Sequence, residues 1–273
     1  MPPRKKRILV TGAAGRVGRL LTPLLSRHFQ LRLCDLAPIP QQSGAEILQG
    51  DLADANFARQ AIAGVEGVVH LAGLVASQVS FEDTLDANYR AMLAVLESCR
   101  LEGVQRFLFA SSHHILGLYP SDRVYDEFAP PAPDGFYGLS KAFGEAACAL
   151  YAYRFGIKTL VIRIGNADPQ VVDARRERLW ISARDLANLV TLGLTANNLS
   201  YEIVYGVSKC PRALFKDDAA AKLGYQPQDD AADHHAPNFR EAAELGPEDG
   251  AGKVGGVFAA DPLPLFDALT RQP

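Results

Sequence analysis

The chain has 273 residues, of which 48% are hydrophobic and 22% charged, and its formal net charge is -3. This length allows one large α/β domain, or a domain with a small appendage. The nearly balanced charge gives no electrostatic reason to expect nucleic acid or an anionic membrane as a partner, and no apolar run approaches the roughly 20 residues that a membrane span requires.

A glycine-rich turn follows the first predicted strand. The apolar run at 7–11 is typical of a parallel strand buried on both faces, and leucines with helical spacing follow the turn. Glycines between a strand and a helix let the backbone approach a pyrophosphate, and the helix N-terminus adds N–H groups and a positive dipole. This placement favours dinucleotide binding over a structural turn. The expected contacts are Gly12, Ala14, Gly15, Arg16, Val17 and Gly18.

A second strand at 31–34 ends in Asp35, about 20 residues beyond the turn, where the ribose-binding acid of a dinucleotide site belongs. An Asp there accepts hydrogen bonds from ribose hydroxyls and repels a 2′-phosphate, which favours NAD over NADP. Arg16 and Arg32 leave some use of NADP open, because a nearby Arg can accommodate that phosphate. Other cofactor contacts are expected at strand ends, from Leu36, Asp51, Leu52, Leu71, Ala72 and Gly73.

Further strands and helices alternate along the chain. Strands are predicted at 46–48, 67–71, 107–110, 158–164 and 202–205, and the longer helical patterns lie at 55–63, 83–101 and 137–155. Repeated strand–helix units imply an α/β fold with a doubly wound parallel sheet of Rossmann type, whose ligands bind beyond the carboxyl ends of the strands. We expect a dinucleotide-binding domain at 1–165, and a small substrate-binding portion with a C-terminal extension at 166–273, packed on the same unit.

The run Ser111–Ser112–His113–His114 follows the predicted strand at 107–110 and therefore belongs at the cleft. The two histidines have no cysteine or carboxylate partner at ligand spacing, so we predict no metal site. A buried or substrate-contacting imidazole is the preferred interpretation. The arginines at 175, 176 and 178 are either solvated or able to grip a carboxylate bidentately, which leaves an acidic substrate open.

Tyr137 and Lys141 lie one helical turn apart and project from one helix face. A neighbouring ammonium stabilises phenolate, so we expect the pKa of Tyr137 to fall below its usual value of about 10. A phenol tuned in this way can exchange a proton with an alcohol. A surface helix pair is the alternative, but the position downstream of the glycine turn and the serine pair favours catalysis.

Taken together, these motifs resemble the extended short-chain dehydrogenase/reductase family in order and spacing. Within the family the likeness is greatest to members that oxidise uronic acids, through the segments at 111–120, 133–141 and 173–180 and the short C-terminal part. The resemblance implies an NAD-dependent dehydrogenase that oxidises a cyclic uronic acid at C1 to an aldarolactone. The alternatives are an epimerase, a dehydratase or a dehydrogenase of another sugar or nucleotide sugar, and a non-catalytic dinucleotide sensor.

The same resemblance implies individual roles. Ser112 hydrogen-bonds the reacting hydroxyl, Tyr137 is the base, and Lys141 lowers the pKa of that base and holds the nicotinamide ribose. Asn88 and Ile164 lie near the cofactor. The substrate-binding residues are Ser77, Ser112, His113, His114, Tyr137, Asn166 and Arg175. Two of these positions depart from the uronate-oxidising members, which carry Asn in place of His113 and Ser in place of Asn166, and the departures bear on the choice of substrate.

Assembly and location complete the expectations. The helical patterns at 83–101 and 137–155 have alanine-rich, moderately apolar faces, and such helices commonly pair between subunits in this superfamily, so a homo-oligomer is expected. The basic run at 4–7 leads into a strand without an apolar signal core. Four scattered cysteines suggest neither disulfides nor zinc. We therefore expect a cytoplasmic protein with a small sugar acid as substrate and no membrane or nucleic-acid partner.

Overall fold

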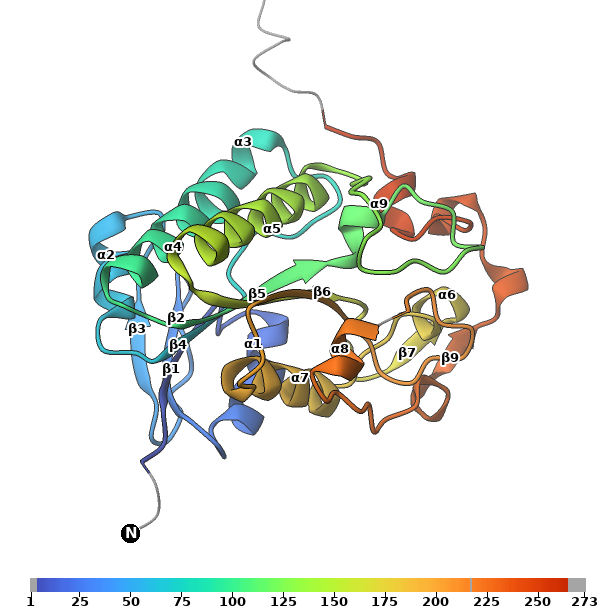
Figure 1. Ribbon diagram of the computed structural model, residues 1–273. Coiled ribbons are helices and arrows are strands. Elements are labelled where there is room, and N and C mark those ends of the chain that lie inside the picture. The colour runs from blue at the N-terminus through green and yellow to red at the C-terminus, as the bar shows by residue number, and fades with distance from the viewer. Residues whose placement is uncertain (1–3, 217, 265–273) are drawn as a thin grey trace, which may run out of the picture.

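A seven-stranded parallel sheet forms the centre of the protein, in the order β3-β2-β1-β4-β5-β6-β8 (Figure 1). The structure is a computed structural model, and it describes residues 4–216 and 218–264. The predicted doubly wound α/β fold of Rossmann type is confirmed. The strands of the sheet are β1 (Arg7–Thr11), β2 (Gln30–Asp35), β3 (Glu46–Gln49), β4 (Gly67–His70), β5 (Arg106–Ser112), β6 (Lys158–Ile164) and β8 (Tyr201–Gly206).

The strand order reverses at β1, which pairs with β2 on one side and with β4 on the other. Val10 of β1 lies between Leu33 and Val69 in the register of the three strands. In an open α/β sheet the ligand crevice forms at this reversal, beyond the carboxyl ends of the strands. The ends of β1 and β4 therefore mark where a ligand site is expected.

Helices cover both faces of the sheet (Figure 1). α1 (Arg16–Leu25) and α7 (Ala183–Thr195) lie on one face, and α2 (Ala55–Ile62), α4 (Ala91–Leu101) and α5 (Phe136–Phe155) lie on the other. The strands are apolar because both faces are buried. In β1, Val10 packs in the core shared with α1 and α7, whereas Leu9 packs in the core shared with α2 and α4.

The helix predicted at 83–101 is interrupted. It consists of α3 (Phe81–Thr84), the π-helix η1 (Leu85–Arg90) and α4 in succession. The wider turn of η1 carries Asn88, whose side chain bonds the backbone of Leu74 at 2.7 and 3.0 Å and donates to the Ser140 hydroxyl at 2.8 Å. Short π-helical turns are frequent at functional sites, and this one joins the segment after β4 to α5.

The chain after β6 adds α7 and β8 to the main layers and a group of short elements beside them (Figure 1). Its two further strands pair in parallel as a separate two-stranded sheet. The short elements, with the 3₁₀ turn η2 that follows β5, are η2 (His113–Leu116), β7 (Val171–Asp173), α6 (Ala174–Glu177), α8 (Asp218–Lys222), η3 (Ala231–His234), β9 (His235–Arg240), η4 (Ala242–Glu244), η5 (Pro247–Asp249) and α9 (Val257–Ala260).

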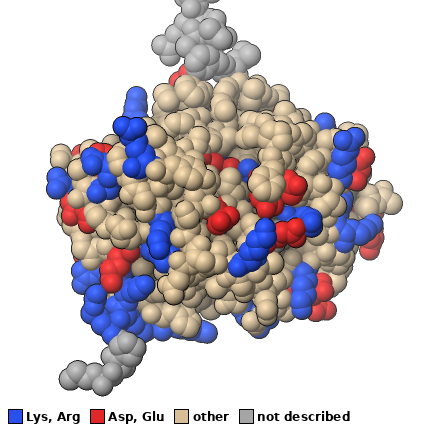
Figure 2. All heavy atoms as spheres, in the orientation of Figure 1, with Lys and Arg blue, Asp and Glu red and all other residues tan. Residues whose placement is uncertain are grey.

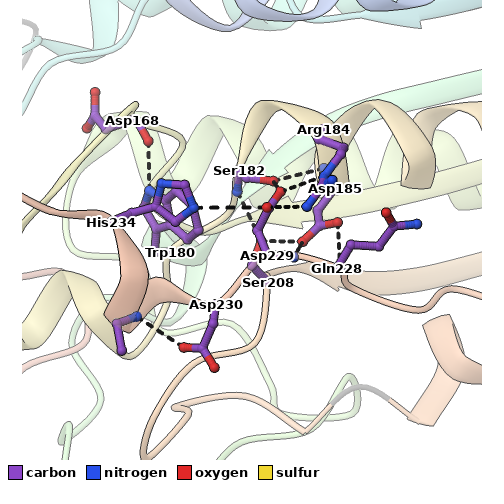
Figure 3. A network of polar contacts seen from close by, with 11 residues as sticks. Asp168, Trp180, Ser182, Arg184, Asp185, Ser208, Gln228, Asp229, Asp230 and His234 are labelled. Carbon is purple, nitrogen blue, oxygen red and sulfur yellow. Dashed lines mark hydrogen bonds and ion pairs between the residues drawn. The ribbon is translucent and has the colours of Figure 1, made fainter.

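A polar network holds the chain after β8 against α7 (Figure 3). The buried carboxylate of Asp185 accepts hydrogen bonds from the Ser208 hydroxyl at 2.7 Å and from the backbone N–H groups of Gln228 and Asp229 at 2.9 and 3.1 Å. Asp229 in turn accepts from the Ser182 hydroxyl at 2.6 Å and pairs with Arg184. These bonds fix the start of the irregular C-terminal region, where hydrophobic periodicity is weak.

Both signs of charge are spread over the face that Figure 2 shows, and basic side chains gather near the N-terminal end. This distribution agrees with the small net charge of the chain. Within residues 4–216 and 218–264, no helix combines the length and the apolar character needed to cross a membrane.

A buried ion pair lies beneath the carboxyl ends of β5 and β6. The Arg163 guanidinium donates to the two carboxylate oxygens of Glu145 at 3.0 and 2.9 Å, and each side chain is less than one tenth exposed. The Ser111 hydroxyl donates to the same carboxylate at 2.6 Å. The pair thus braces the strand end that carries the serine–histidine run.

We expect Glu145→Ala to lower the free energy of unfolding by about 3–5 kcal/mol, because the buried Arg163 charge loses its partner. Urea denaturation at pH 7 measures the change. The matched control is Asp86→Ala, which breaks the exposed pair between Asp86 and Arg90 and should change stability little. Equal losses in the two variants would contradict the role of burial.

Candidate active site

A cavity of about 460 Å³ opens beyond the carboxyl ends of β1, β4, β5 and β6. Its size lies within the range of small-molecule sites. On one side it is lined by the glycine turn, and on the other by η2, α5 and segments from the C-terminal third of the chain. The cavity therefore lies at the reversal of strand order, where the fold places a ligand.

The glycine turn comes close to the end of β4. Gly12 has a φ of +68°, and a Cβ there would lie 2.6 Å from the backbone nitrogen of Ala72, so a side chain is excluded. Gly15 precedes α1, no side chain caps the helix N-terminus, and its first turn holds no acidic residue. The N–H groups of α1 are thus left for an anion. This arrangement fits the pyrophosphate of a dinucleotide.

Some of the predicted cofactor residues line the cavity and others do not. Asp35 is bonded to the turn, since its carboxylate oxygens accept hydrogen bonds from the N–H groups of Ala14 and Ala37, each at 2.9 Å. The residues that line the cavity are Gly12, Gly15, Arg16, Val17, Gly18, Leu71, Gly73, Tyr137, Lys141 and Ile164. The cavity lining does not include Ala14, Asp35, Leu36, Asp51, Leu52, Ala72 or Asn88. Asn88 contributes to the site indirectly, because its side chain is hydrogen-bonded to Leu74 and Ser140.

Ser112, Tyr137 and Lys141 line the same cavity. Ser112 ends β5, which runs two residues further than the predicted strand. Its hydroxyl is hydrogen-bonded to Tyr137 and accepts from the His114 N–H at 3.2 Å. The Lys141 ammonium lies 5.7 Å from the centre of the Tyr137 ring and 5.0 Å from that of Phe109.

The prediction that Lys141 lowers the pKa of Tyr137 below its usual value is wrong. Burial raises the pKa of Tyr137 to about 12, while the hydrogen bond from Ser112 opposes the rise. Burial also lowers the pKa of Lys141 to about 8. Desolvation of the phenolate therefore outweighs the attraction of an ammonium on the same helix face.

The far side of the cavity presents unpaired polar groups. His113 donates from Nδ1 to the carbonyl of Ile164 at 3.1 Å, which leaves Nε2 with a lone pair, and Nε2 is buried without a partner. The side-chain nitrogen of Asn166 is likewise buried and unpaired. Arg175 donates one N–H to the carbonyl of Val254 at 2.9 Å. Burial lowers the pKa of Arg175 to about 10, so the guanidinium stays positive at neutral pH.

Of the predicted substrate residues, Ser112, His113, His114, Tyr137, Asn166 and Arg175 all line the cavity. Ser77 does not, although its carbonyl lies near Gly135. Val75, two residues earlier, lines the cavity instead. Within the described ranges 4–216 and 218–264, no group of three or more His, Cys, Asp or Glu side chains is arranged to hold a metal ion.

Several cavity residues were not predicted from the sequence. Phe258 of α9 stacks on the His114 ring with a centroid distance of 4.0 Å, and Gly255 and Val257 lie beside it. Asp168 joins the glycine turn through an ion pair with Arg16 at 2.7 Å, and its carbonyl accepts from Trp180 at 2.7 Å (Figure 3). The segment around α9 has no periodicity that could place it over the sheet.

Comparison with known proteins agrees with the geometry. The model of the NAD dependent epimerase/dehydratase family matches residues 8–167. The uronate dehydrogenase of Pseudomonas putida is 37% identical over 261 residues, which cover 93% of this chain and 95% of that protein. The NAD-dependent glucose-6-phosphate dehydrogenase of Haloferax volcanii is 33% identical, with 83% of this chain and 94% of that protein covered.

A solved structure is similar over the same extent. The crystal structure of a mutant uronate dehydrogenase from Agrobacterium tumefaciens, complexed with NAD, matches with a TM-score of 0.86 at 34% identity. The match covers 94% of this chain and 98% of that chain. The likeness therefore includes the C-terminal third, which forms one side of the cavity.

We expect the protein to lose stability as the pH falls from about 6.5 toward 3. Burial lowers the pKa of His70 and of His114 to about 3, and lowers that of His113 well below its usual value. Unfolding lets each of them bind a proton in this window, at up to about 1.4 kcal/mol per pH unit for each. Asp134, whose pKa burial raises to about 6, opposes this below pH 6 by the same principle.

Urea denaturation at pH 7, 6 and 5 measures the slope of stability against pH. His70→Gln removes one buried imidazole from the core and leaves a side-chain amide to partner Thr11. It should flatten the slope by about one proton. A slope that is unchanged in this variant would contradict the assignment.

Proposed function

Because the chain belongs to the NAD dependent epimerase/dehydratase family, we propose that it is a uronate dehydrogenase. It oxidises a cyclic uronic acid of the glucuronate or galacturonate type at C1 to an aldarolactone, with NAD as cofactor. One observation carries the proposal: Arg175 lines the same cavity as Tyr137, Ser112 and the glycine turn. The extent of the similarity to uronate dehydrogenases supports it.

NAD is the cofactor that suits this chain. The glycine turn and the N-terminus of α1 would hold its pyrophosphate, and a carboxylate at Asp35 disfavours a 2′-phosphate. Arg32 is not available to bind that phosphate, because it is buried and donates to Glu46 and to the carbonyls of Ala61 and Ala63. When bound, NAD accepts the hydride that leaves the substrate.

The chain itself supplies a base, a hydroxyl and a cation. Tyr137 takes the proton of the anomeric hydroxyl, and Ser112, which is hydrogen-bonded to Tyr137, aligns the oxygen. Lys141 stabilises the phenolate and holds the nicotinamide ribose. The proton transfer is general-base catalysis, which typically contributes about 10²–10⁴-fold to a rate.

The polar groups opposite Tyr137 match a hydroxylated acid. Arg175 and the Asn166 nitrogen are donors suited to a carboxylate, and His113 Nε2 is an acceptor suited to a sugar hydroxyl. Donors and acceptors thus occur together in one small cavity. A second candidate is oxidation of a sugar phosphate, because Arg175 and Arg176 both line the cavity and a sugar-phosphate dehydrogenase is among the similar proteins.

Domain roles follow from the placement of these residues. We assign residues 1–165 to NAD binding and to the catalytic Ser112, Tyr137 and Lys141. We assign residues 166–273 to substrate binding, on the strength of Asn166 and Arg175. The position of α7 and β8 in the layers of the first part supports treating the two parts as one unit.

Assembly and location are part of the proposal. Exposed apolar side chains on α4 and α5 suit a homo-oligomeric interface; they are Leu93, Leu101, Leu139, Leu150, Tyr153 and Phe155. A light-scattering mass equal to the 29.5 kDa monomer would contradict an oligomer. All four cysteines are free, which suits a reducing cytoplasm, and cell fractionation with an antibody to the protein tests that location.

The purified protein should reduce NAD with glucuronate or galacturonate, followed as NADH absorbance. Tyr137→Phe should lower kcat by about 10²–10⁴-fold, because the base is lost, and should leave NAD binding intact. Glucose 6-phosphate is the comparison substrate. Turnover of the phosphate alone would replace the uronate assignment with the second candidate, and no turnover of any of the three would remove both.

Arg175→Gln should lower kcat/KM for the uronate by about 10- to 150-fold, because a charge-assisted contact with the carboxylate is lost. The loss should be much smaller for the neutral aldose of the same configuration. Arg154→Gln, an exposed site on α5, is the matched control and should behave as wild type. Equal losses for the acid and the aldose would contradict a carboxylate clamp.

A further inference from the structure

Asp134 carries a buried carboxylate beside the cavity. This carboxylate has no role in the reaction proposed above. It precedes α5, and its side chain is fully buried. Oδ2 lies 2.7 Å from Nδ1 of His114, whereas Oδ1 is buried without a hydrogen-bond partner. Arg175 and His113 influence the ionisation of Asp134 from the same cavity, but neither pairs with it. Burying a carboxylate costs free energy, which points to a role for Asp134.

Three glycines make room for this carboxylate. A Cβ at Gly117 would lie 1.9 Å from Oδ2 of Asp134, one at Gly255 would lie 2.0 Å from it, and one at Gly138 would lie 3.1 Å from Oδ1. These glycines come from three separate segments, after η2, before α9 and inside α5. The surroundings of Asp134 are therefore built to accept it at one position.

The proton of the Asp134–His114 hydrogen bond lies on the imidazole. Burial raises the pKa of Asp134 to about 6 and lowers that of His114 to about 3, with Arg175 lowering it further. At neutral pH the carboxylate is thus ionised and the imidazole is neutral. The bond then runs from Nδ1–H to Oδ2, and Nε2 keeps its lone pair.

Contacts with two neighbouring rings also fix the orientation of the His114 imidazole. It stacks on Phe258 with a centroid distance of 4.0 Å and lies 4.1 Å from the His113 ring. With Nδ1 occupied by Asp134, the free edge of this cavity-lining ring is Nε2. His113 has the same arrangement, because its Nδ1 donates to Ile164. Two adjacent imidazoles therefore each offer an acceptor nitrogen.

We propose that Asp134 is a positioning residue that holds His114 in the Nδ1–H tautomer, so that Nε2 accepts a hydrogen bond from a substrate hydroxyl. The ligand chemistry is a polyhydroxylated sugar, whose hydroxyls donate to His113 and His114 while its anionic group faces Arg175. The proposal rests on the proposed function only for the identity of that sugar. Asp134 itself does not touch the reacting atoms.

The first measurement is the tautomer of His114. Long-range ¹H–¹⁵N correlation spectra of histidine-labelled protein at pH 7.5 distinguish Nδ1–H from Nε2–H, and His114→Gln identifies the signal. Wild type should show Nδ1–H. Asp134→Ala should shift His114 to Nε2–H, the form that free histidine favours in water. Asp134→Asn, which keeps an acceptor oxygen without the charge, should retain Nδ1–H.

The second measurement is kcat/KM for the uronate. Asp134→Ala should lower it by about 5- to 100-fold, because a donor replaces the acceptor that the substrate hydroxyl needs. Asp134→Asn should keep most of the activity. Asp126→Asn removes the same charge from an exposed site of the same loop and is the matched control. Equal losses in Asp134→Asn and Asp134→Ala would overturn the tautomer role in favour of a role for charge.

A third variant guards against misfolding of Asp134→Ala. Gly117 has φ of -61° and ψ of -29°, which alanine adopts freely. The three atoms nearest to the Cβ of Gly117→Ala would all belong to the Asp134 side chain, so the variant should displace the carboxylate and reproduce both effects. A wild-type His114 in the Nε2–H form, or an unchanged tautomer in both Asp134→Ala and Gly117→Ala, overturns the proposal. These spectra need no substrate, so they decide it even if the uronate assignment fails.

Discussion

Backbone contact between the glycine turn and the end of β4 is the constraint on which the cleft depends. Gly12 lies against Ala72 so closely that no Cβ fits between them. The hydroxyl of Thr11 reinforces the contact, because it accepts from the Ala72 N–H at 3.2 Å and is bonded to Nδ1 of His70 at 2.9 Å. The turn therefore directs the N-terminus of α1 into the cavity, and the rest of the site is assembled around that opening.

Desolvation governs the ionisation of the groups in this cavity. Burial raises the pKa of Tyr137 and lowers those of Lys141 and His114, and in each case it is the largest cause of the shift. The low local dielectric of a buried site strengthens the hydrogen bonds inside it and makes an unpaired polar atom costly. The unpaired nitrogens of His113 and Asn166 are therefore places where a ligand gains the most by forming a bond.

The two sides of the cavity have different origins. The side that holds the glycine turn comes from consecutive strand–helix units, whose order along the chain is also their order in the sheet on each side of β1. The opposite side is assembled from η2, the chain just after β6, α6 and the region of α9. His114 illustrates the second kind of assembly, since it is held by Asp134 from one segment and by Phe258 from another.

The sequence by itself determined the parallel sheet, the glycine turn, the place of Asp35 and the shared cavity of Ser112, Tyr137 and Lys141. Each of these depends on local periodicity or on the spacing between neighbouring elements, and both can be read directly from the amino-acid sequence. Tertiary structure alone decided the π-helix around Asn88, the raised pKa of Tyr137, the absence of Ser77 from the cavity, and the places of Asp134 and Phe258. Those features depend on burial and on contacts between segments far apart in the chain, and no local pattern records either.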